Sequence, residues 1–143
     1  KEVAAITREH EPVRRLMQIN GVGPLIASAL YALVGDGRQY RNGRDLAVAL
    51  GLTPRQHSSG GKEKLLGISK RGDKYVRTLL SHGARSALRT APSRTDRISR
   101  WVLALAERSR PNVAVTALAN KTARVAWAML RHGANYEPER VAA

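Results

Sequence analysis

Apolar residues recur at spacings of three and four residues along almost the whole chain, and this periodicity constrains the fold more than any other feature of the sequence. Side chains at this spacing lie on one face of an α-helix. Phenylalanine is absent and aromatic residues make up only 4% of the chain, although strands are usually rich in such residues. The sequence therefore predicts an all-α fold, a compact multi-helix domain.

Turn and cap residues divide this pattern into separate elements. Pro12 interrupts a helix over residues 1–18, and Pro24 suits the first turn of the next helix. Between these two helices, Gly21-Val22-Gly23 predicts a helix-hairpin-helix-like element. The predicted helices cover residues 1–18, 24–34, 42–50, 73–91, 96–108 and 112–132. Residues 52–72 carry Gly, Ser and cations without a clear period, and we expect a long Ser/Gly-rich basic loop there.

The length of 143 residues is typical of a single globular domain. We expect residues 1–15 to be the end of an upstream, coiled-coil-like helix, residues 16–135 to form the domain and residues 136–143 to be a flexible tail. Because the first residue is Lys1 and not Met, the chain is expected to be an excerpt of a longer protein. No apolar run approaches the roughly 20 residues of a membrane span, so no membrane partner is expected.

The charge of the chain points to a polyanionic partner. Lys and Arg number 25 against 11 Asp and Glu, which gives a net charge of +14. Residues 53–100 hold 12 of the cations and 3 of the acids. Arg outnumbers Lys, and its planar guanidinium grips phosphate through two hydrogen bonds. These features favour nucleic acid as the partner.

Two parts of the sequence are candidates for phosphate contact. Lys74, Arg77, Arg85 and Arg89 line one side of the predicted helix that begins at Asp73. A basic ridge of this kind is also what an ordinary solvated helix face looks like. The glycines of the predicted hairpin, Gly21 and Gly23, would let backbone N–H groups face a phosphate. The alternative for that turn is a tight connection used only for packing.

The predicted loop combines hydroxyl groups, glycines and cations. Glycines keep the backbone accessible beside a serine, and nearby cations can stabilise the charge of a phosphoryl transition state. The alternative is a flexible Ser/Gly linker. The candidate backbone-binding cations in and beside this loop are Arg55, Lys62, Lys70 and Arg71. No metal site is predicted, since Cys is absent and the His and acidic residues are dispersed.

Four motifs stand in the order seen in one family. They are LMQINGVGP at 16–24, DLAVALGLTP at 45–54, SSGG at 58–61 and ISKRGD at 68–73. With these motifs, residues 16–135 resemble the C-terminal transposase domain of the insertion-sequence transposases related to the Piv DNA invertases, a family that includes bridge-RNA-guided recombinases. The resemblance implies that an N-terminal RuvC-like domain carries Mg²⁺ ligands and that the C-terminal domain contributes a serine that becomes linked to DNA.

The family's Ser-Gly pair falls on Ser59, with Ser58 as the competing position because the serine is doubled here. The resemblance implies DNA as the partner, a guide (bridge) RNA as a second candidate partner, a homo-oligomeric full-length protein and a cytoplasmic, nucleoid-associated location in a bacterium. It also implies that the fragment holds no cofactor and is inactive alone, with Mg²⁺ bound by the absent domain. The alternatives are a non-catalytic helical nucleic-acid-binding module and a structural or oligomerisation domain.

Overall fold

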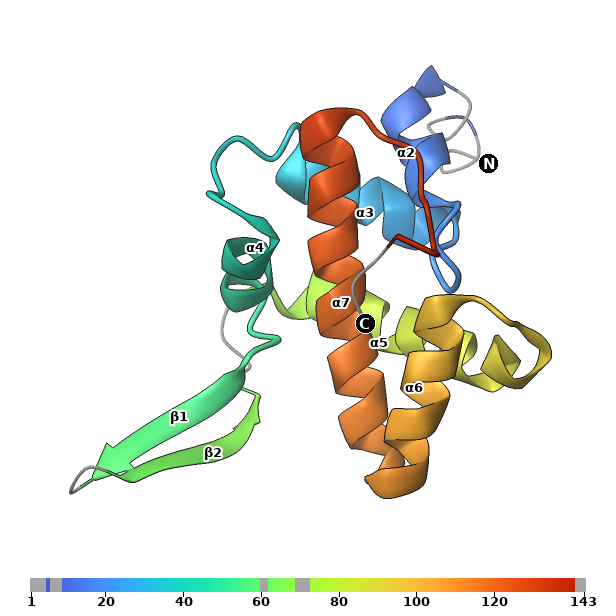
Figure 1. Cartoon of the computed structure of the whole chain (residues 1–143). Helices are drawn as coiled ribbons and strands as arrows, with labels where there is room; N and C mark the ends of the chain where they lie inside the picture. Colours follow the sequence, from blue (N-terminus) through green and yellow to red (C-terminus); the bar gives the residue numbers. More distant parts are fainter. Residues whose placement is uncertain (1–4, 6–8, 60–61, 69–72, 141–143) are drawn as a thin grey trace.

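The longest helix organises the molecule, since every other helix packs against it or against its neighbours. In the computed structural model, residues 5, 9–59, 62–68 and 73–140 are described. Helix α7 (Pro111–His132) runs through the middle and contacts α2 (Glu11–Leu16), α3 (Pro24–Val34), α4 (Gly43–Ala49), α5 (Lys74–Thr90) and α6 (Arg97–Arg108) (Figure 1). A short 3₁₀ turn, η1 (Ala91–Ser93), joins α5 to α6. The all-α prediction is confirmed for this helical body.

The core lies between α7 and the helices around it. Small residues on the buried face of α7 allow the neighbouring backbones to approach closely, and larger residues fill the space that remains. The alanines are Ala114, Ala119, Ala123 and Ala126. The fully buried leucines are Leu16, Leu30, Leu46, Leu50, Leu52 and Leu80. Each such leucine contributes about 1.5–3 kcal/mol relative to an exposed position.

Most of the predicted helix ends are confirmed by their cap geometry. The side chains of Asn42, Asp73 and Asp96 accept hydrogen bonds from backbone N–H groups in the first turns of α4, α5 and α6. Gly133 ends α7 in the left-handed conformation, with φ of 62° and ψ of 34°. Asn112 is not the cap of α7. That helix begins at Pro111 with Arg110 before it, because Pro is suited to the first helical turn.

The long loop expected over residues 52–72 is wrong in the part that the structure describes. Strands β1 (Pro54–Ser59) and β2 (Lys62–Ile68) pair antiparallel, and the resulting hairpin extends away from the helices (Figure 1). Within the described residues, its strands contact each other and no other element. Apolar and polar residues alternate along a strand when one face of the sheet is buried, and a hairpin that packs against no other element does not require this alternation. The Gly60-Gly61 pair is the sequence signal for such a connection.

The boundaries of the domain are described in part. Of the predicted upstream segment 1–15, α2 begins at Glu11. At the other end, the backbone N–H of Tyr136 donates to Oε1 of Gln18 at 2.7 Å, and Nε2 of Gln18 donates to Oδ1 of Asn135 at 3.2 Å. The start of the predicted flexible tail is thus bonded to Gln18, just after α2, Glu139 pairs with Arg100 of α6 at 3.8 Å, and residues 141–143 lie outside the described residues. Among the helices described, none is long and apolar enough to cross a membrane.

Candidate nucleic-acid interface

The outer face of α5 carries the predicted basic ridge. The apolar residues of α5 that face the core include Val76, Leu80 and Ala84. At about 100° per residue, Lys74, Arg85 and Arg89 lie on the opposite side of the helix. All three cations are exposed, and none of them forms an ion pair or hydrogen bond with another described side chain. Their charges are therefore available to an anionic partner.

Arg77 belongs to the flank of the ridge. It is half-buried, and its Nη1 donates to the carbonyl oxygen of Leu50 at 3.3 Å. Leu50 is the C-cap of α4, where carbonyl groups lack helical partners, so Arg77 stabilises the end of that helix. The sequence predicted Arg77 as one of four equivalent ridge residues. The structure gives it a role in packing α5 against α4.

The Gly21 turn packs against α5. Gly21 has φ of +89°, and a Cβ atom placed on it would lie 2.3 Å from the carbonyl oxygen of Gly83. Gly83 is equally close to the turn, because its own Cβ would lie 2.4 Å from the carbonyl oxygen of Gly21. Glycine is thus required at both positions for the close approach of two backbones. This is the packing role that the sequence left open as an alternative.

Gly23 differs from Gly21. It is the N-cap of α3, with φ of −91°, and a Cβ atom there would meet nothing within 4 Å. No side chain caps the α3 N-terminus, and Pro24 and Leu25 beside it are exposed. Pro24 carries no N–H, so the first N–H groups of α3 belong to Leu25 and Ile26, and no side-chain cap accepts from them. The space around Gly23 is compatible with the predicted backbone contact to phosphate.

The turn that contains Gly21 and the basic ridge of α5 do not form one surface. Gly83 of α5 faces the Gly21 turn, and Arg85 is rotated by about 200° from Gly83 around the helix axis. The two predicted phosphate-binding features thus lie on opposite sides of α5. Sequence reasoning could not separate them, because the packing of the turn against Gly83 joins residues far apart in the chain.

The candidate serines lie at the end of the β-hairpin. Ser59 is the last residue of β1 and pairs with Lys62, the first residue of β2, while Ser58 pairs with Glu63. Arg55 lies near the base of the hairpin, about 13 Å from Ser59 along the strand. Lys62 is therefore beside Ser59 in the register and Arg55 is not. Gly60, Gly61, Lys70 and Arg71 lie outside the described residues.

The base of the hairpin is fixed to the helical body. Leu52, just before β1, is buried, and its carbonyl oxygen accepts a hydrogen bond from Nδ2 of Asn120 on α7 at 3.1 Å. Beyond β2, five residues separate Ile68 from Lys74, and the six Cα–Cα steps between them reach at most about 20 Å. The start of α5 therefore lies within this reach of the end of β2.

A second group of cations was missed in the sequence. Lys121 of α7 is 9% exposed, and its Nζ lies 4.9 Å from the ring centroid of Trp101. Burial lowers the pKa of Lys121, and the nearby charges of Arg124 and Arg97 lower it further. Lys121 has the helical spacing of the apolar residues Val115, Leu118 and Val125, and this spacing was the sequence signal that could have indicated its burial.

The described residues offer no cluster of three or more His, Cys, Asp or Glu side chains that could hold a metal ion. The dispersed acids are used locally instead. Asp45 accepts from the guanidinium of Arg41 at 3.0 Å, and Asp96 accepts from Arg94 at 3.0 Å. The hydrogen bond from Arg41 lowers the pKa of Asp45. Asp45 and Asp96 each pair with a nearby arginine and do not converge on a metal site.

Comparison with known proteins identifies the family to which the chain belongs. Residues 13–99 match the model of the Transposase IS116/IS110/IS902 family. The chain is 49% identical over 138 residues to a probable family 20 transposase of Pseudomonas aeruginosa, covering 96% of this chain and 41% of that protein. It is also 49% identical over 136 residues to the transposase for insertion sequence element IS1111A of Coxiella burnetii, covering 95% of this chain and 37% of that protein. The chain thus spans about two fifths of the length of these relatives.

Proposed function

Because the chain belongs to the IS116/IS110/IS902 transposase family, we propose that it is a domain of a transposase that binds DNA and supplies the serine for DNA strand cleavage and exchange. The relationship to Piv invertases and bridge-RNA-guided recombinases is part of this proposal. So are a guide RNA as a second partner and a homo-oligomeric full-length protein. These finer assignments rest on the four sequence motifs.

The exposed cations of α5 carry the DNA-binding part of the proposal. Lys74, Arg85 and Arg89 span about 22 Å along the helix, and B-DNA carries one negative charge per about 1.7 Å of its axis. One helix face can therefore contact several phosphates. Such contacts neutralise backbone charge and hold the duplex in place without reading its sequence.

The hairpin would present its serine to the DNA held by α5. The distance from Ile68 to Lys74, at most about 20 Å, is less than one turn of B-DNA at about 34 Å. A duplex on the basic face can therefore extend to the base of the hairpin, and Ser59 and Lys62 lie about 20 Å farther along the strands. Ser59 and Lys62 are register partners at its far end. A cation at this position would stabilise negative charge on a phosphate under attack.

The proposed chemistry is a transesterification at phosphorus. The Ser59 hydroxyl loses its proton, a bond forms between Oγ and phosphorus, and one ester bond between phosphorus and a deoxyribose oxygen breaks. The departing sugar oxygen takes up a proton. The product is a phosphoserine link to one DNA end, which conserves the energy of the ester bond for a later rejoining step.

An unassisted serine hydroxyl is a weak nucleophile, and its activation requires a base or a metal ion. The carboxylates described here are separate from one another and do not form a ligand set for Mg²⁺. We therefore assign activation to a RuvC-like domain of the full-length protein. This division of labour predicts that the 143-residue chain binds DNA but does not cut it.

The test uses a transposase in which this chain is joined to its RuvC-like domain. Ser59→Ala should abolish the detergent-resistant protein–DNA adduct on a labelled transposon end, with DNA affinity within about twofold of the original because phosphate contacts dominate binding. Ser58→Ala is the matched control and should retain the adduct.

Each result assigns a function. Loss of the adduct in Ser58→Ala alone would move the nucleophile to Ser58. An adduct that survives both substitutions would exclude serine chemistry in the hairpin and leave the chain as a non-catalytic DNA-binding module, the second candidate function.

A further inference from the structure

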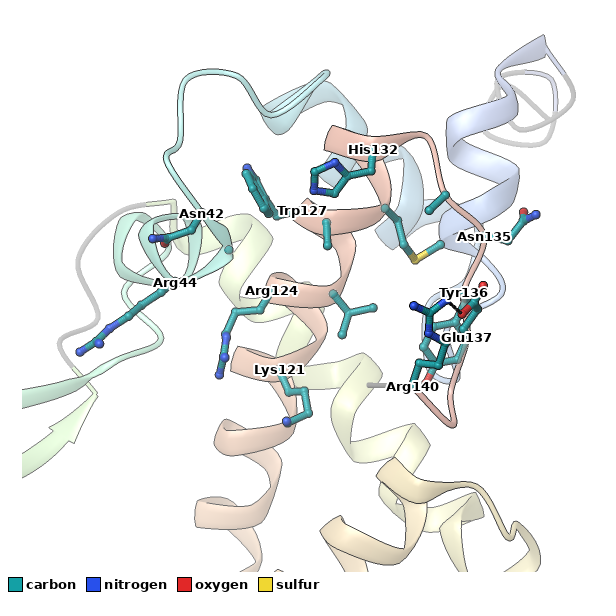
Figure 2. Close-up of a pocket in the computed structure, with 15 residues that line it drawn as sticks. Asn42, Arg44, Lys121, Arg124, Trp127, His132, Asn135, Tyr136, Glu137 and Arg140 are labelled. Atoms are coloured by element: carbon teal, nitrogen blue, oxygen red, sulfur yellow. Dashed lines mark hydrogen bonds and ion pairs between the residues drawn. The ribbon is translucent and has the colours of Figure 1, made fainter. Parts of the chain in front are cut away.

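A groove runs along the exposed face of α7, between the start of α4 and the segment that follows α7. Its volume is about 610 Å³. Helix α7 forms its floor from Lys121 to His132, with the start of α4 on one side and the segment after α7 on the other (Figure 2). The eleven helical steps from Lys121 to His132 give it a length of about 16 Å.

Both walls of the groove are held by specific contacts. Gly43 brings α4 against α7, since a Cβ atom on Gly43 would lie 2.9 Å from the carbonyl oxygen of Arg124. The opposite wall is fixed where Tyr136 and Asn135 bond to Gln18. The shape of the groove is therefore built into the fold.

The floor is apolar and its upper end is aromatic. Val125 and Ala128 are half-buried and line the groove. The indole N–H of Trp127 donates to the carbonyl oxygen of Gly37 at 3.0 Å, which fixes the ring, and the His132 ring lies edge-on to it at 5.9 Å between centroids. Such a surface fits a flat, apolar group.

The charged groups on the walls are predominantly positive. Lys121, Arg124, Arg44 and Arg140 all line the groove, and Glu137 is the carboxylate among its lining residues, 2.9 Å from Arg140. Arg97 adds a further positive charge near Lys121. A ligand that matches this groove therefore combines a flat apolar part with a negative charge.

We propose that the α7 groove binds an unpaired segment of nucleic acid, with a base on the apolar floor beside Trp127 and phosphates beside the exposed Arg124 and Arg44. Bases stacked on apolar and aromatic groups, with the backbone along a cationic surface, are the usual arrangement in single-strand binding. The inference rests on the proposed DNA-binding function. It adds a second surface, selective for unpaired nucleotides, to the duplex-binding face of α5.

The test fills the groove without changing its charge. Ala128→Phe places a ring on the floor, and Ala104→Phe, on an exposed position of α6, is the matched control. Binding is measured by fluorescence anisotropy with a dT decamer, an rU decamer, an abasic decamer with the same phosphates, and a duplex. Circular dichroism checks the fold of each variant.

Ala128→Phe should weaken binding of the dT or the rU decamer by about fivefold or more, the loss of one stacked base, and leave the abasic decamer and the duplex unchanged. The decamer that loses more affinity identifies DNA or RNA as the ligand. Arg124→Gln, which preserves the floor, should weaken the dT and abasic decamers alike.

Equal losses for the dT and abasic decamers in Ala128→Phe would overturn the inference, as would no loss for any decamer. Poly-glutamate is a further probe in the same assay: if Ala128→Phe loses poly-glutamate binding but keeps all three decamers, the groove is assigned to an acidic protein segment and the inference is overturned. Duplex binding by α5 is measured separately, so failure of the groove leaves the proposed function standing.

Discussion

Removing the basic ridge of α5 should change how salt affects DNA binding. The triple variant Lys74→Gln, Arg85→Gln, Arg89→Gln replaces three exposed cations with residues that retain high helix propensity. Arg77 is left intact, because its hydrogen bond to Leu50 would confound binding with stability. The variant should therefore fold as the original chain does.

The expected magnitude follows from the number of phosphate contacts. Each cation that neutralises one phosphate adds about 0.9 to the slope of log affinity against log salt. Loss of three contacts should reduce the slope by about 2.7. A rise from about 50 to about 200 mM salt should then reduce the affinity advantage of the original chain about 40-fold.

The assay is fluorescence anisotropy of a labelled duplex at a series of salt concentrations. A control variant with the same loss of charge, Arg108→Gln, Arg110→Gln, Arg131→Gln, removes exposed cations from other surfaces. This control variant should change the slope by less than about 0.9, the value for one phosphate contact. If both variants lose the same slope, net charge alone drives binding and the α5 face is not the interface. If the ridge variant keeps the original slope, the phosphates lie elsewhere.

Three further predictions test the fold and the isolated chain. Gly21→Ala should destabilise the chain by about 2–4 kcal/mol in urea, since its φ is +89° and its Cβ would overlap the Gly83 carbonyl. Gly23→Ala meets no steric contact and loses only the preference for Gly over Ala at the N-cap, so it should cost less than about 1 kcal/mol; equal effects would contradict the packing described. Burial raises the pKa of Asp96, but hydrogen bonds from Ser99 and Arg94 outweigh it and the net shift is downward. The ionised Asp96 therefore stabilises the fold above its unfolded pKa of about 3.9, and in urea titrations the advantage over Asp96→Asn should fall as pH drops below about 4; a difference independent of pH would refute this. The 143-residue chain with Mg²⁺ and a transposon end should leave the DNA uncut, and cleavage that survives repurification and disappears on substitution within this chain would show a complete site.

Local signals in the sequence determined the helices. The apolar periodicity, the Asp and Asn caps and the terminal Gly133 act within a few residues of one another, so the elements they specify could be located without tertiary structure. The outer basic face of α5 followed from the same periodicity. The position of Ser59 beside two glycines was also readable as a motif.

Tertiary structure decided which of these residues come together. The close approach of Gly21 and Gly83 places the turn between α2 and α3 on the side of α5 opposite to the basic ridge. The hydrogen bond from Arg77 to Leu50 removes one cation from that ridge. Both contacts join residues far apart in the chain. The α7 groove likewise exists only because Gly43 admits α4 against α7 at Arg124. Contacts of this kind depend on packing between elements, which short-range patterns in the sequence do not encode.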